Sequence, residues 1–328
     1  MKYKNLDYCE RKKIEIGLRD GMSIRGIARR LSRLPSSISR EVNRYAFEGD
    51  YDAFFAEVLS QHRKGNRHST RKLDNNLRLR LYVFSEIRRY RSPNQIANRL
   101  RIKYPDDEAM RVSAETIYTY IYILPRGELK KELISCLRKE HKERKRQKAS
   151  GSKEKRGKIT DMISIEERPA DVADRSVPGH WEGDLILGKA NKSALGTIVE
   201  RTTRSVILVP LKGRDAKTVR KAFEKEMKTL PKKMKKSMTY DQGKEMAEHK
   251  LFTKNTKIKV YFAHPHSPWE RGSNENMNGL LRQFFPKGTD FTKVTRKEIN
   301  RVQWLMNTRP RKVLGYYTPQ EKMAELLH

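Results

Sequence analysis

Three acidic residues in this chain lie where carboxylates can do chemistry. Asp184 lies within an apolar run, Asp241 directly follows another, and Glu275 opens a predicted helix. A strand, the end of a second strand and the start of a helix can bring three side chains together. Converging carboxylates repel one another unless cations lie between them. The pattern therefore predicts a metal site.

The metal that best suits such a site is Mg²⁺. It prefers oxygen ligands and keeps several waters, so a few carboxylates are enough. In phosphoryl transfer, two such ions about 3.5–4 Å apart activate the attacking oxygen and stabilise the leaving oxygen. We expect Asp184 to bridge two Mg²⁺ ions, Asp241 to bind one and Glu275 the other, with Mn²⁺ as a possible substitute. Taken singly, each acid also has a structural explanation, in a turn or at a helix dipole.

Three further residues are predicted to support these acids. Arg271 and Asn278 lie four residues before and three after Glu275, and therefore on its face of a helix. We expect them to hold a phosphate and the rotamer of Glu275, with a purely structural role as the alternative. Glu182 shares the face of Asp184 by strand alternation. It is either a second acid behind the site or a solvent-facing residue.

The charge of the chain points to a polyanionic partner. Lys and Arg number 73 against 40 Asp and Glu, a net charge of +33. Neutralising DNA phosphates releases condensed counterions, which favours binding by so basic a protein. No apolar stretch approaches the about 20 residues of a membrane span, and the N-terminus lacks the apolar region of a signal peptide. We therefore expect a cytoplasmic, nucleoid-associated protein that binds double-stranded DNA and no membrane.

Residues 1–65 are predicted to form a helix-turn-helix DNA-binding domain. Asp7 and Glu10 have the spacing of a capping box, and Gly21 ends the helix that they begin. Ser23 caps a short second helix, and Pro35 opens the third. Short polar and basic side chains at a helix start suit base edges and phosphates, although a helical hairpin with a solvated face has the same pattern. The predicted DNA-contacting residues of the third helix are Ser36, Ser37, Ser39, Arg40, Asn43 and Arg44.

Residues 70–137 repeat this pattern and are predicted to form a second helix-turn-helix-like domain. Ser92 begins one helix with capping-box spacing, and Ser113 can cap another. On the latter, Thr119 and Tyr122 lie on the outer side and are candidates for DNA contact, unless the tyrosines there belong to the core. Two DNA-reading domains imply an extended recognition site.

The rest of the chain changes character twice. Residues 138–170 are rich in Lys and Arg without a sustained apolar period, which indicates a basic linker. Residues 171–292 then show three strands, a helix, two strands and a helix, the order of an α/β ribonuclease H-like catalytic core. Residues 293–328 are predicted as a helical C-terminal segment. The fold class is therefore multidomain, with all-α helix-turn-helix units followed by an α/β core. The predicted elements of the core are Trp181–Leu187, Leu195–Glu200, Ser205–Leu211, Ala216–Leu230, Ser237–Tyr240, Ile258–Ala263 and a helix ending near Phe284.

The chain resembles the IS-thirty family of bacterial insertion-sequence transposases. The N-terminal resemblance lies in Gly21–Leu31 and Ser36–Glu41. In the core it lies in His180-Trp-Glu-Gly-Asp-Leu-Ile186, Tyr240-Asp-Gln-Gly-Lys-Glu245, Ser267-Pro-Trp-Glu-Arg-Gly-Ser-Asn-Glu-Asn276 and Asn307-Thr-Arg-Pro-Arg-Lys312.

This resemblance implies a function. Asp184, Asp241 and Glu275 would be the acidic triad (the DDE motif) of a retroviral-integrase-like core, and all three are present. The enzyme would bind the terminal inverted repeats of its element, hydrolyse a strand to expose a 3′-hydroxyl, and join that end to target DNA. Bringing two DNA ends together makes a homodimer or a larger assembly the expected state.

Two other functions stay open on the sequence alone. One is a DNA-binding regulator with an inactive integrase-like core, against which the intact triad argues. The other is a nuclease that cuts without joining. A retroviral-type integrase would carry a zinc domain, which the two distant cysteines Cys9 and Cys136 cannot provide.

Overall fold

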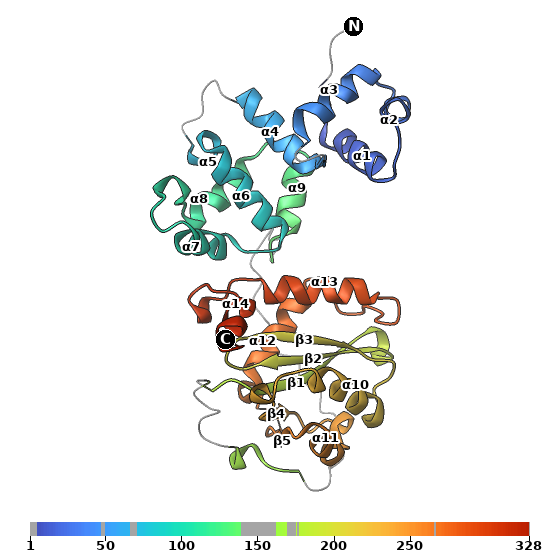
Figure 1. The fold of residues 1–328 in the computed structure, drawn as a ribbon, viewed down its shortest axis with the longest axis vertical. Coiled ribbons are helices and arrows are strands. Elements are labelled where there is room, and N and C mark those ends of the chain that lie inside the picture. Colours follow the sequence, from blue (N-terminus) through green and yellow to red (C-terminus); the bar gives the residue numbers. More distant parts are fainter. Residues whose placement is uncertain are drawn as a thin grey trace. The chain divides into compact units, whose positions relative to one another are not determined.

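The protein is described here by a computed structural model covering residues 5–46, 50–65, 71–138, 162–168, 175, 177–265 and 267–327. It divides into two compact units, residues 1–143 and residues 144–328 (Figure 1). In its described residues the first is built from helices, and the second is built on a sheet. Residues 139–161 of the predicted linker lie outside the described residues.

In the first unit, a helix begins at each start that the sequence predicts. The Asp7 carboxylate accepts from the Glu10 N–H in a capping box, and the Ser23 hydroxyl accepts from the N–H of Gly26. Ser92 forms the second predicted capping box, and Ser113 caps the helix that follows it. The helices are α1 (Tyr8–Arg19), α2 (Ile24–Arg30), α3 (Pro35–Tyr45), α4 (Ala53–Gly65), α5 (Lys72–Asn75), α6 (Leu77–Arg88), α7 (Pro93–Lys103), α8 (Ala114–Ile123) and α9 (Glu128–Ser135).

One hydrophobic cluster runs through the whole first unit. It includes Ile14 and Ile38 from the first three helices and Leu79 and Ile117 from the later ones, all fully buried. The two predicted domains, residues 1–65 and 70–137, therefore share a core in the structure. On α8, Tyr120 belongs to this core.

The second unit contains a five-stranded mixed sheet in the order β3-β2-β1-β4-β5. The first three strands are antiparallel neighbours, whereas β1 pairs with β4, and β4 with β5, in parallel (Figure 1). The predicted strands are confirmed to within one or two residues, as is the ribonuclease H-like arrangement. The elements are β1 (His180–Leu187), β2 (Ala194–Glu200), β3 (Val206–Pro210), α10 (Ala216–Lys228), β4 (Ser237–Tyr240), α11 (His249–Thr256), β5 (Lys259–Phe262), α12 (Gly272–Leu281), α13 (Arg296–Asn307) and α14 (Pro319–Leu327).

The predicted order of elements was wrong at one place, because it omitted α11. Since β4 and β5 are parallel, a hairpin cannot join them and a crossover is required. The helix gives few local signals. It buries Phe252, and it ends at Lys257, which takes the left-handed conformation with φ 63° in place of the usual glycine.

The two faces of the sheet have different roles. On one face Trp181 and Tyr240 pack against α10 through side chains such as Phe223. Gly183 lies on the same face, and the close approach of the Tyr240 ring requires glycine there, because a Cβ would come within 2.7 Å of the ring. The alternate residues of β1, which include Asp184, lie on the other face, toward α12.

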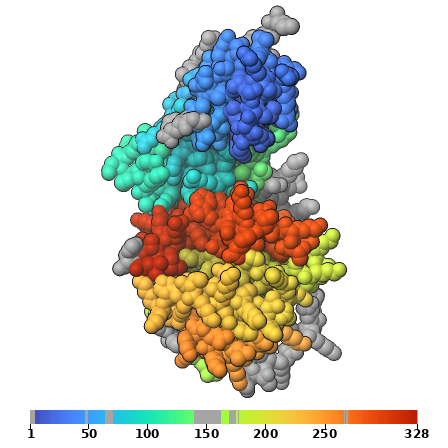
Figure 2. All heavy atoms as spheres, turned by 45° about the vertical axis from the view of Figure 1, so that its right-hand side comes forward, coloured from blue at the N-terminus to red at the C-terminus, as the bar shows by residue number. Residues whose placement is uncertain are grey.

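Both edges of the sheet are covered. Along β3, the Asn307 side chain accepts from the Val206 N–H at 2.8 Å, and the Gln303 side chain accepts from the Leu208 N–H at 2.7 Å. Figure 2 shows the C-terminal helices, in red, packed directly on the sheet region. At the opposite edge the Phe262 N–H donates to the Ile163 carbonyl at 2.9 Å. Residues predicted as a C-terminal segment and as the end of a linker thus complete the sheet.

Candidate active site and DNA-binding surface

Asp184 lies on β1, and Asp241 directly follows the neighbouring parallel strand β4. In the β1–β4 register Glu182 pairs with Thr239, so Asp184 and Asp241 each lie two residues beyond this pair, at the same end of the two strands. A single guanidinium, that of Arg271, lies between the two carboxylates. Its Nη1 is 3.5 Å from Asp184 Oδ1 and its Nη2 is 3.5 Å from Asp241 Oδ2.

Arg271 comes from the short 3₁₀ turn Pro268–Arg271 that leads into α12. Its Nη1 also donates to the Gly183 carbonyl at 3.2 Å. The sequence places Arg271 on the face of Glu275, and the structure adds contacts with both aspartates. Burial lowers the pKa of the guanidinium, but the two carboxylates more than offset this and raise it overall.

Asp184 is further held by α12 and by its own strand. The Asn278 side-chain amide donates to Asp184 Oδ2 at 2.9 Å, and the Leu185 N–H donates to Asp184 Oδ1 at 2.9 Å. Burial raises the pKa of Asp184, Arg271 lowers it and Asp241 raises it, so that the net direction is upward. The ionised pair is therefore under electrostatic strain in the protein alone.

The structure does not bring Glu275 to this pair. It lies in the first turn of α12 with an exposed side chain. Among the residues that the structure describes, no group of three or more His, Cys, Asp and Glu side chains is close enough to hold a metal ion. The aspartate pair does fit a hard cation, because two carboxylates converge on one place and that place holds positive charge. The ligand role of Glu275 stays a prediction.

Glu182 is fully buried, so its predicted solvent-facing alternative is wrong. Its Oε1 lies 3.0 Å from Arg201 Nη1, and its Oε2 accepts from the Asn274 N–H at 2.8 Å. The side chain thereby satisfies one of the free N–H groups at the start of α12 and ties the helix to β1. Burial lowers the pKa of Arg201 to about 10, against the opposing effect of Glu182.

Asn274 completes this connection, and sequence reasoning missed it. Its amide donates to the Glu182 carbonyl at 2.7 Å and to the Thr197 carbonyl at 3.2 Å, while its Oδ1 accepts from Thr197 Oγ1 at 2.9 Å. These three fully buried residues, which we call the α12 latch, join β1, β2 and α12. Within the latch, Glu182 lies two residues before Asp184 and Asn274 lies one residue before Glu275. The latch therefore sets the positions of both acids.

Glu245 is a further acid near the pair that the sequence reading did not select. It follows Asp241 in the turn after β4, and a Cβ on Gly243 would come within 2.6 Å of its carboxyl group. Burial raises the pKa of Glu245, and Asp241 and Asp184 add to the rise. The only signal for it was its place in the motif Tyr240–Glu245.

In the first unit, α3 presents the predicted DNA-contacting residues. Ser36, Arg40, Asn43 and Arg44 are exposed, whereas Ser37 and Ser39 are half-buried. Figure 2 shows α1–α3, in dark blue, as one contiguous surface. The third helix of this helix-turn-helix is therefore accessible along its outer face.

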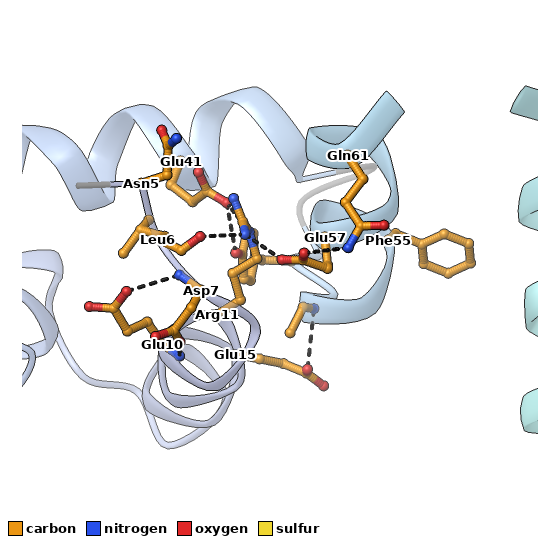
Figure 3. Close-up of polar contacts among 12 residues, drawn as sticks. Asn5, Leu6, Asp7, Glu10, Arg11, Glu15, Glu41, Phe55, Glu57 and Gln61 are labelled. Atoms are coloured by element: carbon orange, nitrogen blue, oxygen red, sulfur yellow. Dashed lines mark hydrogen bonds and ion pairs between the residues drawn. The ribbon is translucent and has the colours of Figure 1, made fainter. Parts of the chain in front are cut away.

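A buried arginine fixes the inner side of α3. Arg11 Nε lies 2.6 Å from Glu41 Oε1 on α3, and its Nη1 lies 2.5 Å from Glu57 Oε2 on α4 (Figure 3). Nη1 also donates to the Leu6 carbonyl at 2.8 Å. This ion triad joins α1, α3 and α4 beneath the outer face of α3.

The second predicted DNA-binding surface is less polar. Thr119 and Tyr122 are exposed on α8 as expected, but Tyr118 and Ile123 are exposed beside them. The role of Thr119 and Tyr122 in DNA binding stays a prediction.

Family comparisons agree with the two kinds of unit. Residues 2–45 match the helix-turn-helix domain family, and residues 174–268 match the integrase core domain family. The fold and the paired acids therefore define an integrase-core enzyme with an attached DNA-binding unit, the class of polynucleotidyl transferases.

Similar proteins narrow this class. The chain is 42% identical to the transposase for insertion sequence element IS1086 of Cupriavidus metallidurans, over 99% of this chain and 96% of that protein. It is 41% identical to transposase InsI for element IS30A of Escherichia coli, over 97% and 82% of the two chains. A transposase for element IS4351 of Bacteroides fragilis is 35% identical over 99% and 97%. The chain belongs to the IS30 (IS-thirty) family of insertion-sequence transposases, which confirms the resemblance seen in its motifs.

One coarser expectation also has support. Integrase-core transposases generally use a divalent metal ion, in keeping with the aspartate pair. In the described part of the chain, no helix is both long enough and apolar enough to cross a membrane.

Proposed function

We propose that this enzyme binds the terminal inverted repeats of its insertion sequence, cleaves a strand there to expose a 3′-hydroxyl, and joins that end to target DNA. The observation that carries the proposal is that Asp184 and Asp241 both lie 3.5 Å from the same cationic group, the guanidinium of Arg271. Family membership supplies the class of reaction, and the accessible α3 supplies a surface for reading the ends.

The proposal assigns Asp184, Asp241 and Glu275 to two Mg²⁺ ions, which Mn²⁺ could replace. Such ions would activate the attacking oxygen and stabilise the leaving oxygen. Asn278 holds one oxygen of Asp184 through its amide and thereby orients the carboxylate. The latch fixes the turn of α12 that carries Glu275, and Arg271 lies where a DNA phosphate would approach the pair.

The proposed partners are double-stranded DNA and further copies of the chain. Ser36, Arg40 and Asn43 would contact the repeat in its major groove, and Arg44 a phosphate. Two element ends must come together for joining, which requires at least a homodimer. We place the protein in the cytoplasm, associated with the nucleoid through DNA.

The decisive experiment combines the full-length protein with a labelled fragment carrying the terminal repeat of its element, in Mg²⁺ and in EDTA. We expect nicking at the repeat and strand-joined products in Mg²⁺ only. Asp184→Asn, Asp241→Asn and Glu275→Gln should each abolish both products and leave repeat binding intact. Binding without products would favour a regulator, and nicks without joined strands would favour a nuclease.

A further inference from the structure

Arg271 occupies the place that a metal ion needs. Its two terminal nitrogens each lie 3.5 Å from one aspartate oxygen, so the guanidinium spans the gap between Asp184 and Asp241. Mg²⁺ binds its oxygen ligands at about 2.0–2.1 Å. An ion that takes both carboxylates at this distance leaves no room for the guanidinium between them. The two cations therefore exclude each other.

The contacts of Arg271 are those of a group that can leave. Both ion pairs are long, and beside them the guanidinium donates to the Gly183 carbonyl at 3.2 Å. Arg271 is also the last residue before α12, with φ −121° and ψ 31°, outside the helical conformation. The next residue, Gly272, has no atom within 4 Å of where a Cβ would stand. The junction between Arg271 and α12 is therefore open on the Gly272 side.

We propose that Arg271 is a built-in counter-ion, which holds the Asp184–Asp241 pair in the protein alone and is displaced when the metal enters. This inference rests on the metal site of the proposed function. Once displaced, the guanidinium remains close to the pair and is free to take a DNA phosphate, for which its planar fork of N–H groups is suited.

The arrangement has a thermodynamic consequence. A phosphate that draws Arg271 away from the aspartates removes the competitor of the metal, so DNA and metal each strengthen the binding of the other. In the protein without DNA, the metal must displace Arg271 unaided and binds weakly. The counter-ion would thus keep the site largely metal-free until DNA is in place.

The test is Mn²⁺ binding to the full-length protein, followed by the electron paramagnetic resonance signal of free Mn²⁺. Without DNA, Arg271→Gln should bind Mn²⁺ about tenfold more tightly than the wild type, within the usual range of coupling between two ligands. Arg296→Gln removes the same charge from an arginine paired with Glu226 instead, and should leave the affinity unchanged. An Arg271→Gln affinity equal to or weaker than that of the wild type would overturn the proposal.

A second arm adds a duplex oligonucleotide carrying the terminal repeat. The duplex should strengthen Mn²⁺ binding to the wild type and have little effect on Arg271→Gln, because that variant has no counter-ion to remove. An equal gain in both proteins would contradict the role of Arg271. If Arg271→Gln does not fold, Arg271→Lys serves instead, since a single ammonium cannot span both carboxylates and should also tighten Mn²⁺ binding.

Asp241→Asn separates this inference from the proposed function. It should greatly weaken Mn²⁺ binding whether or not Arg271 competes with the metal. If Asp241→Asn binds Mn²⁺ as the wild type does, the metal site itself is wrong. If only the Arg271 variants fail to bind more tightly, the metal site stands and the counter-ion role falls.

Discussion

The two units of this protein each place one arginine between two carboxylates, and the two arrangements differ in tightness. In the helix-turn-helix unit, Arg11 lies 2.6 Å from Glu41 and 2.5 Å from Glu57, and its side chain is 3% exposed. In the catalytic unit, Arg271 lies 3.5 Å from each of its aspartates; its side chain is 16% exposed, and those of the aspartates are about a quarter exposed. One arginine between two carboxylates thus forms a tight structural contact in the helix-turn-helix unit. In the catalytic unit the same set of charges forms a looser contact, in which the arginine can be exchanged for another cation.

The difference follows from what each site has to do. Glu41 lies on the helix that we expect to read DNA, so its position must not change when DNA binds. A closely paired and largely buried ion triad suits this need, because an unpaired charge left inside the protein would be costly. Asp184 and Asp241 must exchange a partner instead, and partial exposure keeps the cost of that exchange low.

The strongest way to break this comparison is to remove Arg11. Arg11→Met should destabilise the first unit by about 3–5 kcal/mol, because two buried carboxylates lose their counter-charge. Repeat binding should fall with it. Arg271→Met should cost far less, since water reaches its partners. Urea unfolding of both variants measures the contrast, and equal losses would show that the two arginines have the same structural role.

The catalytic unit also contains a tight, buried contact, the α12 latch, which can be compared with the Arg11 triad. Asn274→Ala removes three buried side-chain hydrogen bonds, one from the Thr197 hydroxyl and two to the carbonyl groups of Glu182 and Thr197, at about 1–3 kcal/mol for each group left unsatisfied. We expect strand transfer to fall more than repeat binding, because α12 positions Asn278 and Glu275. Asn276→Ala, an exposed residue of the same helix, is the matched control. Equal effects of the two variants on strand transfer would remove the latch from the mechanism.

Replacing Arg40 tests whether the outer face of α3, the helix held by the Arg11 triad, reads DNA. If Arg40 reads a base, Arg40→Gln should cost about 1–3 kcal/mol on the terminal repeat and less on random DNA. Salt titration of both complexes separates the two kinds of contact, because each phosphate contact contributes about −0.9 to the log–log slope. An equal loss on both DNAs, together with a shallower slope, would make Arg40 a phosphate contact.

What the sequence could predict here was local. Apolar runs located the strands, and capping residues such as Asp7 and Ser92 located helix starts, because both signals lie within a few neighbouring residues. The place of Asp184 opposite Asp241 was also foreseeable, since it follows from the strand order of the fold. The position of Arg271 between them was not, because helical spacing relates it to Glu275 and says nothing of partners on other elements. Asn274 and Arg201 were missed for the same reason, since their partners lie on other strands.

The smallest predicted effect is a change in melting temperature when the charge of Asp184 is removed, and its direction is what matters. Because the pKa of Asp184 is raised in the folded protein, the folded state holds a proton there more tightly than the unfolded chain does. The ionised carboxylate therefore lowers stability above the folded pKa, and this penalty disappears as the pH falls below the ordinary Asp value of about 3.9. Without metal at pH 7, Asp184→Asn should raise the melting temperature, and the difference from the wild type should narrow toward pH 4. Glu57→Gln should lower the melting temperature at pH 7, because it weakens a closed triad. If Asp184→Asn were also destabilising in EDTA, the pair at Asp184 would be a structural joint like that of Arg11, and the contrast between the two arginines would fail.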